Sequence, residues 1–258
     1  MATLTRNGVK LAYEESGSGP AMVLVHGWCC DRTYFAPQAE HYRSTHRVVS
    51  VDLRGHGASD KPEQEYTIAG FADDVAWLCS ELGITRPVVI GHSMGGTTAL
   101  ALAAGHPGLP SAIVMLDAPL LLPQELVSAL LPQLVAAFRS PGYRDAARQF
   151  VGDQMFRPGD DPQRKERILD GMSGAPQHVL ASAFEAIWGF DSVAALQACK
   201  VPALFIGADP LLSDVRRMRE LCPTLLTAQT AGAGHFHQLE VPEQVNAMID
   251  RFLAISGI

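Results

Sequence analysis

Ser93 lies in the segment GHSMGG (residues 91–96), which has the spacing Gly-x-Ser-x-Gly. Small residues at positions 91, 95 and 96 allow a sharp turn from a strand into a helix that exposes the serine above the sheet. An apolar run, Val88–Ile90, comes just before the segment, and a helical stretch follows it. A serine held this way could attack a carbonyl carbon, although the same pattern also fits a glycine-rich turn whose serine only caps the helix.

A His-Gly pair follows a second apolar run, VLV, at residues 23–25. Because His26 and Gly27 stand where that run ends, we expect the chain to turn there and to expose the backbone N–H of Trp28. This group and the N–H of Met94 could stabilise the negative charge that forms on a carbonyl oxygen under attack. On its own the pair also fits an ordinary turn, so it supports this interpretation only together with the serine segment.

Two more glycine-rich segments contain histidines. VDLRGHGASD (51–60) follows a predicted strand, and its polar side chains are expected to make structural hydrogen bonds around the turn: Arg54, His56 and Ser59. GAGHFHQ (232–238) carries His235 and His237 in front of an amphipathic helix that begins after Pro242. A serine hydroxyl is a poor nucleophile at neutral pH and needs a histidine to take its proton, so this segment could supply the base.

The elements that must position these residues are short apolar runs separated by helical segments. The runs are nearly continuous in Val, Ile, Leu and Met, which is typical of strands covered on both faces of a parallel sheet. Between them, GFADDVAWLCSEL (70–82) has apolar residues at helical spacing. The alternation indicates an α/β protein with a doubly wound, mostly parallel sheet and a short antiparallel hairpin around Leu11–Tyr13. The predicted strands lie within 21–27, 47–55, 87–93, 111–119 and 201–209.

Residues 120–190 break this alternation, since they contain helical stretches rich in Leu, Ala, Phe and Met but no clear buried strand. Extra core helices would explain the pattern, but we favour a helical cap inserted after the strand that ends near Asp117. We therefore predict a core made of residues 1–119 and 191–258 and a cap made of residues 120–190. A cap in this position could act as a lid that excludes water from the chemistry.

With these motifs, the whole chain resembles the α/β-hydrolase superfamily, in its branch of small cap-bearing serine esterases and lactonases. The resemblance rests on GHSMGG, on HGW (26–28) and on GHF (234–236), while residues 120–190 contribute little to it. It implies that Ser93 is the nucleophile and that His235, which follows GAG and precedes Phe, is the base. His237 is then expected to be a polar surface residue.

The acid that orients the histidine has two candidates. In most members of the family it follows the penultimate core strand, three residues after a glycine; here that position after Gly207 is Pro210, and Asp209 falls one residue short. Asp117, at the end of IVMLD, has the position that some branches use, and a triad needs only a carboxylate at the ring nitrogen remote from the serine. We expect Asp117 to be the acid, Asp209 to be its rival and Asp214 to lie at the surface.

A serine rather than a carboxylate at position 93 favours acyl transfer to water, through an acyl-enzyme formed from an ester or lactone. Apolar side chains in residues 120–190 favour a small apolar substrate, and we expect Leu121, Phe156 and Trp188 to contact it. Three alternatives stay open because the fold alone does not decide the reaction: a C–C bond hydrolase of ring-cleavage products, a perhydrolase or cofactor-free oxygenase, and a ligand receptor without catalytic activity.

Composition limits the partners that we expect. The 258-residue chain has a net charge of −7 and no basic run, so we expect neither nucleic acid nor membrane as a partner. Its first residues lack the apolar region of a secretory signal, no apolar run reaches the roughly 18 residues of a membrane span, and the five cysteines lack metal-ligand spacing. We predict a cytoplasmic monomer or homodimer with reduced cysteines that acts on a small molecule without a metal or organic cofactor.

Overall fold

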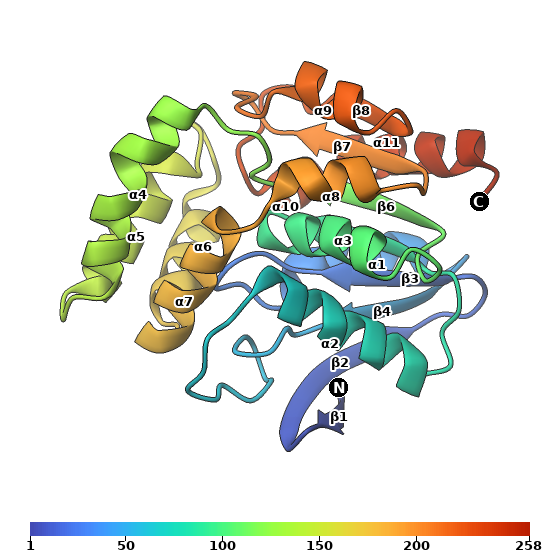
Figure 1. Ribbon diagram of the computed structural model, residues 1–258, viewed down its shortest axis with the longest axis horizontal. Coiled ribbons are helices and arrows are strands. Elements are labelled where there is room, and N and C mark those ends of the chain that lie inside the picture. The colour runs from blue at the N-terminus through green and yellow to red at the C-terminus, as the bar shows by residue number, and fades with distance from the viewer.

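The computed structural model describes the backbone of residues 1–258 and every side chain except that of Leu126. Eight strands form one sheet in the order β1-β2-β4-β3-β5-β6-β7-β8 (Figure 1). The hairpin of β1 (Ala2–Arg6) and β2 (Val9–Ser16) is antiparallel, as is the pairing of β2 with β4, and all other neighbours are parallel. The predicted α/β fold with a mostly parallel sheet is confirmed.

All five predicted strands are present, each shorter than the apolar segment that predicted it. They are β3 (Ala21–Val25), β4 (Arg47–Val51), β5 (Val88–His92), β6 (Ala112–Leu116) and β7 (Ala203–Gly207). Strand β8 (Leu225–Gln229) was not predicted from the sequence; it pairs only with β7, at the edge of the sheet. Its sequence, LLTAQ, is only partly buried and so lacks the continuous apolar run of a central strand.

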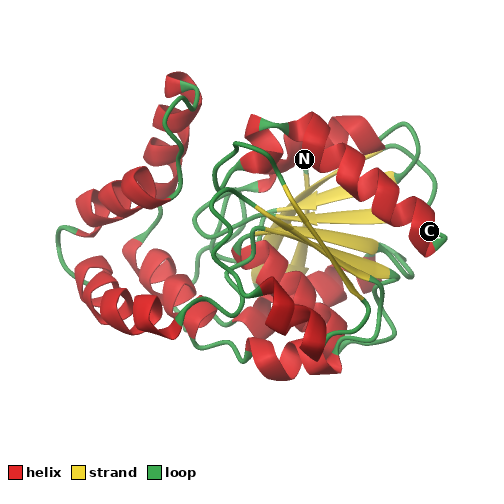
Figure 2. Ribbon diagram, turned by 90° about the horizontal axis from the view of Figure 1, so that it is seen from above, coloured by secondary structure: helices red, strands yellow, loops and turns green.

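The sheet separates two hydrophobic cores, because successive residues of a strand point to opposite faces. On β3, Val23 and Val25 enter the first core, whereas Met22 and Leu24 enter the second. The first core is covered by α2 (Ile68–Glu81), α3 (Met94–Gly105), α8 (Ser192–Ala198) and α9 (Val215–Leu221). The second is covered by α1 (Ala36–Tyr42) and α11 (Pro242–Ser256), on the other side of the sheet (Figure 2). Two short helices lie in connecting loops, η1 (Arg32–Phe35) and α10 (His237–Glu240).

Five helices lie between β6 and β7, and the four before α8 fall within the segment for which the sequence predicted a cap. These four are α4 (Gln124–Phe138), α5 (Tyr143–Gln154), α6 (Pro162–Ser173) and α7 (Gln177–Trp188). Figures 1 and 2 show them as a group at one side of the sheet, and α7 contacts the core through α2. The domain limits at residues 119 and 191 and the role of these helices as a lid stay predictions.

In the described part of the chain, no single helix is both long enough and apolar enough to span a membrane. The bent pair α7–α8 meets the requirement for a span by length and composition alone. Six residues of α7 are buried within the protein, among them Val179, Leu180 and Phe184.

Candidate active site

Ser93 occupies a sharp turn between β5 and α3. Its backbone angles, φ 54° and ψ −121°, are unfavourable for a residue with a side chain, and its hydroxyl makes no capping bond to the helix. Close backbone packing enforces this turn: a Cβ added to Gly91 would lie 2.0 Å from the carbonyl oxygen of Gly95, and one added to Gly95 would lie 2.0 Å from that of Val25. The strained strand-to-helix turn that the glycines predicted is therefore present.

His235 lies on the loop between β8 and α10, and its Nδ1 is 2.6 Å from Oδ2 of Asp117. The other carboxylate oxygen of Asp117 accepts a hydrogen bond from the backbone N–H of Ala208 at 3.0 Å. Burial acts to raise the pKa of Asp117, but the hydrogen bond and charge of His235 outweigh it and hold that pKa below its ordinary value. The charged carboxylate makes Nδ1 of His235 a donor and leaves Nε2 free to accept a proton.

The rival acid takes part in a different contact. The Asp209 carboxylate pairs with Arg157, with 3.3 Å between Oδ2 and Nη2. Asp214 is exposed, as expected, and caps α9 by accepting a hydrogen bond from the N–H of Arg217 at 2.9 Å. Of the candidate acids, the structure brings Asp117 to the ring of His235.

His237 is not at the surface, so that expectation is wrong. It is the first residue of α10, its side chain is fully buried, and its Nδ1 lies 3.1 Å from Oγ1 of Thr230. Burial lowers its pKa to about 4, which keeps the ring neutral at physiological pH. The polar loop sequence did not show that this short helix would turn the side chain inward.

His92 joins the serine turn to the histidine loop, a role that the sequence did not indicate. This fully buried residue immediately precedes Ser93, and its Nε2 donates a hydrogen bond of 2.8 Å to the backbone carbonyl of His235. The centroids of the two imidazole rings are 4.6 Å apart. Burial lowers the pKa of His92 well below its ordinary value, so the neighbour of His235 is a neutral ring. The motif G-x-S-x-G leaves the residue before the serine unspecified, so the sequence pattern gave no reason to single out His92.

The turn at His26–Trp28 lies directly beside the serine. A Cβ added to Gly27 would lie 3.2 Å from Cβ of Ser93, so a larger residue would crowd this approach. His26 holds the turn in place, because its Nδ1 donates to the Gly27 carbonyl at 2.8 Å and its Nε2 accepts from the N–H of Leu53 at 3.0 Å. The N–H of Met94, at the first position of α3, has no acceptor within the helix. Of the two amides expected in an oxyanion hole, one thus belongs to the residue after Ser93 and the other to the residue after Gly27, which packs beside Ser93.

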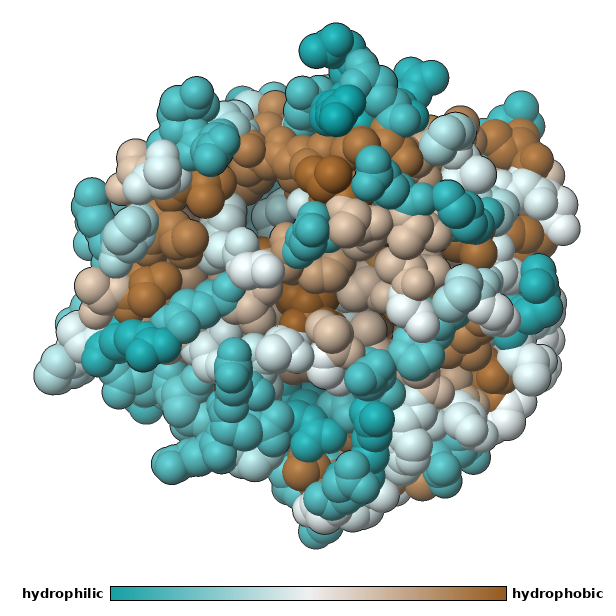
Figure 3. Space-filling model, viewed as in Figure 1, coloured by the Kyte–Doolittle hydropathy of each residue, from teal (hydrophilic) through white to brown (hydrophobic). Residues whose placement is uncertain are grey.

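A cavity of about 480 Å³ contains Ser93, Asp117, His235 and Trp28 in its wall. Figure 3 shows a hollow bordered by hydrophobic side chains on the face of the molecule seen in Figure 1. Of the predicted substrate contacts, Trp188 and Phe156 line the cavity. Leu121 is not among the described side chains that line it; it packs against the first core, and its neighbour Leu122 lines the cavity.

The two thiols beside the Trp28 turn are buried. Burial raises the pKa of Cys29 and Cys30, beside the Trp28 turn, well above the ordinary value, which disfavours a thiolate nucleophile there. Among the described residues, no group of three or more His, Cys, Asp or Glu side chains could hold a metal ion.

Comparison with known proteins agrees with the α/β fold. Residues 20–242 match the family model described as "alpha/beta hydrolase fold". A thermophilic esterase from Thermogutta terrifontis has a TM-score of 0.86 at 26% identity, with 98% of this chain and 97% of that chain covered. An enol-lactonase from Burkholderia xenovorans has a TM-score of 0.85 at 26% identity, with 98% and 100% covered.

A match of higher identity is confined to part of the chain. The 2-(acetamidomethylene)succinate hydrolase of Mesorhizobium japonicum is 36% identical over 109 residues, which are 42% of this chain. The chain spans 39% of that relative's length in this alignment. The family model, in contrast, extends from the strand before His26 to the loop that carries His235. This chain therefore belongs to the α/β-hydrolase fold family.

Proposed function

We propose that this α/β hydrolase cleaves carboxylic esters or lactones of small apolar compounds, with Ser93 as nucleophile, His235 as base and Asp117 as the acid of the triad. The observation that carries the proposal is the 2.6 Å contact between His235 Nδ1 and Asp117 Oδ2, in the wall of the same cavity as Ser93. The similarity in sequence and structure to an esterase and an enol-lactonase supports it.

The reaction begins when Oγ of Ser93 attacks the carbonyl carbon of the substrate and Nε2 of His235 takes the hydroxyl proton. The backbone N–H groups of Trp28 and Met94 stabilise the oxyanion, and Asp117 stabilises the imidazolium that has formed. His235 then gives its proton to the leaving alcohol, which departs from an ester or stays attached to the acyl group of a lactone. Water, activated by His235, releases the carboxylic acid and restores the serine.

The inserted helices support a role in substrate binding and water exclusion. Their cavity-facing residues are mostly apolar, and the indole Nε1 of Trp28 donates to the backbone carbonyl of Leu180 in α7 at 2.8 Å. This bond ties the turn that carries an oxyanion donor to the predicted cap. An apolar enclosure strengthens the electrostatic interactions made with the transition state. The chemistry proposed uses these protein groups, the small-molecule substrate and one water molecule.

A hydrolysis screen tests the proposal. The substrates are p-nitrophenyl esters of increasing acyl length, lactones of several ring sizes and vinylogous diketones, and Ser93→Ala is the control variant. We expect the wild-type protein to cleave esters or lactones and the variant to lose that activity. Cleavage of the diketones alone would favour a C–C bond hydrolase, and unchanged activity in Ser93→Ala would exclude a serine mechanism.

A further inference from the structure

The elements that line the cavity differ in the polarity of the side chains that they contribute. The side chains described on α4 and α7 that line it are all apolar: Val127, Leu130, Leu131, Leu134, Phe184, Ile187 and Trp188. The charged lining residues other than Asp117 and His235 come from two other segments. Asp153 and Arg157 lie at and just after the end of α5, and Asp209 lies in the loop after β7. We call these three residues the charged rim.

The charged rim lies beside the loop that carries the base. The N–H of His235 donates to the carbonyl of Met155 at 3.1 Å, so the rim segment is bonded to the histidine itself. A Cβ added to Gly234 would lie 3.3 Å from Cγ of Arg157, and the N–H of Asp209 donates to the carbonyl of Ala233 at 2.9 Å. Both segments of the rim thus contact the residues immediately before His235.

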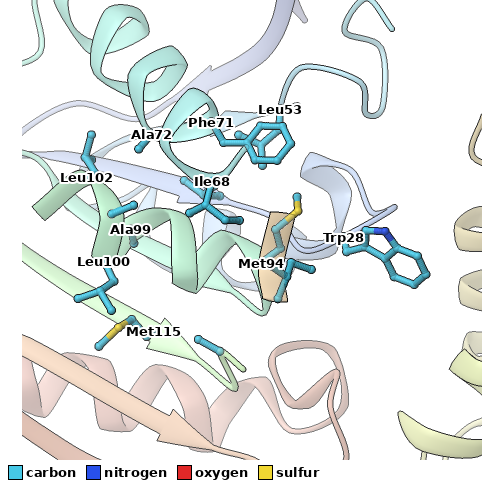
Figure 4. Packing of buried hydrophobic residues seen from close by; sticks show 14 of the residues in the cluster. Trp28, Leu53, Ile68, Phe71, Ala72, Met94, Ala99, Leu100, Leu102 and Met115 are labelled. Atoms are coloured by element: carbon cyan, nitrogen blue, oxygen red, sulfur yellow. The ribbon is translucent and has the colours of Figure 1, made fainter. Parts of the chain in front are cut away.

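The Trp28 turn has the opposite surroundings. Figure 4 shows the Trp28 side chain pointing away from the core residues around Met94. Its ring centroid lies 5.3 Å from that of Phe184 and 5.5 Å from that of Phe138, both on the inserted helices. The oxyanion side of the cavity is therefore bordered by aromatic side chains, whereas the charged rim lies on the base side, where Met155 and Phe156 also line the wall.

The proposed mechanism places the two halves of an ester on these two sides. The leaving oxygen must lie at His235 to receive its proton, so the alcohol half extends toward the charged rim. The acyl half is then left with the apolar wall of α4 and α7. The rim combines the two carboxylates of Asp153 and Asp209 with one guanidinium, that of Arg157, which gives a formal charge of −1. A net negative rim repels an anionic alcohol group and accepts a polar neutral or cationic one.

We propose that this enzyme selects esters with an apolar acyl group and a polar alcohol group that is neutral or cationic, and that Asp153, Arg157 and Asp209 determine this selectivity. The inference rests on the proposed serine-hydrolase function and specifies its substrate class.

Butyrate esters that share one acyl group and differ in the alcohol test this selectivity. The alcohols are ethanol, glycerol, choline and glycolate, of which the last carries a carboxylate. At low ionic strength we expect kcat/KM for the glycerol and choline esters to exceed that for the glycolate ester by about tenfold or more, and added salt to narrow the difference. The double variant Asp153→Asn/Asp209→Asn should also reduce the difference in kcat/KM between the choline and glycolate esters. Arg157→Met should increase that difference.

Asp214→Asn is the matched control. Asp214 is an exposed aspartate five residues after Asp209 that caps α9 outside the cavity wall, and asparagine caps helices equally well. Its selectivity should equal that of the wild type. A glycolate ester cleaved as fast as the choline ester, or a ratio that the double variant leaves unchanged, would overturn the selectivity but not the hydrolase function. If none of the esters is cleaved and an organophosphonate leaves Ser93 unmodified, the proposed function and the selectivity both fall.

Discussion

At the scale of single residues, the carboxylate that meets His235 belongs to Asp117, at the end of β6. Its φ of 43° is in the left-handed region, which aspartate tolerates better than most residues because its short side chain bonds locally. From there Asp117 reaches the N–H of Ala208 with one oxygen and the ring of His235 with the other. The loop after β7, where most family members carry the acid, here carries Asp209, which pairs with Arg157.

Replacement of each acid by its amide should separate their roles. Asp117→Asn keeps the shape of the side chain but allows His235 to adopt the wrong tautomer, so kcat for a neutral p-nitrophenyl ester should fall by about 10⁴-fold. Asp209→Asn should change kcat for the same substrate only slightly. Thermal unfolding of both variants is the control, since neither substitution should alter the fold. The reverse order of activities would mean that Asp209 is the acid.

At the scale of elements, the serine is held by the packing of α3 against β3 and β5. A Cβ added to Gly95 would lie 2.5 Å from the carbonyl oxygen of His26 in addition to its contact with Val25, so the helix cannot accept a larger residue there. These neighbours are backbone atoms, which leave little room for relaxation. The start of α3 is therefore among the most constrained parts of the site.

Alanine substitutions at the two ends of α3 should have opposite effects. Gly95→Ala forces the helix away from β3 and should lower the free energy of unfolding by about 3 kcal/mol or more, with loss of activity. Gly105→Ala is the control, because no atom lies within 4 Å of a Cβ at Gly105. That variant should be as stable as the wild type or more stable by up to about 1 kcal/mol. Urea unfolding measures both, and equal stabilities would contradict the packing described.

The elements also show how far the sequence could predict the structure. Strands β3 to β7 and the serine turn were predictable because burial on both faces and the need for small residues restrict the residues allowed there. The edge strand β8 was not predictable, because it pairs with one strand only and is partly exposed, so its sequence lacks a continuous apolar run. The choice between Leu121 and Leu122 in the cavity wall depends on how the chain leaves β6, which local sequence does not determine. The inward position of His237 likewise depends on how its loop folds, which brings Nδ1 of His237 to Oγ1 of Thr230.

At the scale of the whole molecule, four histidines are buried as neutral rings, and the stability of the fold depends on these rings remaining unprotonated. Burial lowers the pKa of each of them, for His56 to about 3 and for His237 to about 4. The four residues are His26, His56, His92 and His237. His26 and His56 lie in turns, His92 ends β5 beside Ser93, and His237 begins α10 two residues after His235, so acid should affect the site and the fold together.

Stability should consequently fall as the pH drops below 6.5. Below that value the unfolded chain binds protons on these histidines, while the folded protein does not until the pH reaches the lowered pKa values. Each histidine then contributes a loss of about 1.4 kcal/mol per pH unit, in the window from 6.5 down to about 4 for His237 and about 3 for His56. Urea unfolding midpoints between pH 7.5 and 4.5 measure how steeply the stability falls with pH. The variant His56→Asn should lose less stability per pH unit than the wild type. A midpoint independent of pH over that range would contradict neutral buried histidines.

The central claim for the whole molecule is that it forms a covalent intermediate on Ser93 with help from His235. Labelling by an organophosphonate ester, read by intact mass and peptide mapping, tests this most directly. Ser213→Ala removes another serine of the cavity wall and is the matched control for Ser93→Ala. We predict one adduct, on Ser93, in the wild type and in Ser213→Ala, and none in Ser93→Ala. An unlabelled wild-type protein, or an adduct that persists in Ser93→Ala, would contradict the account.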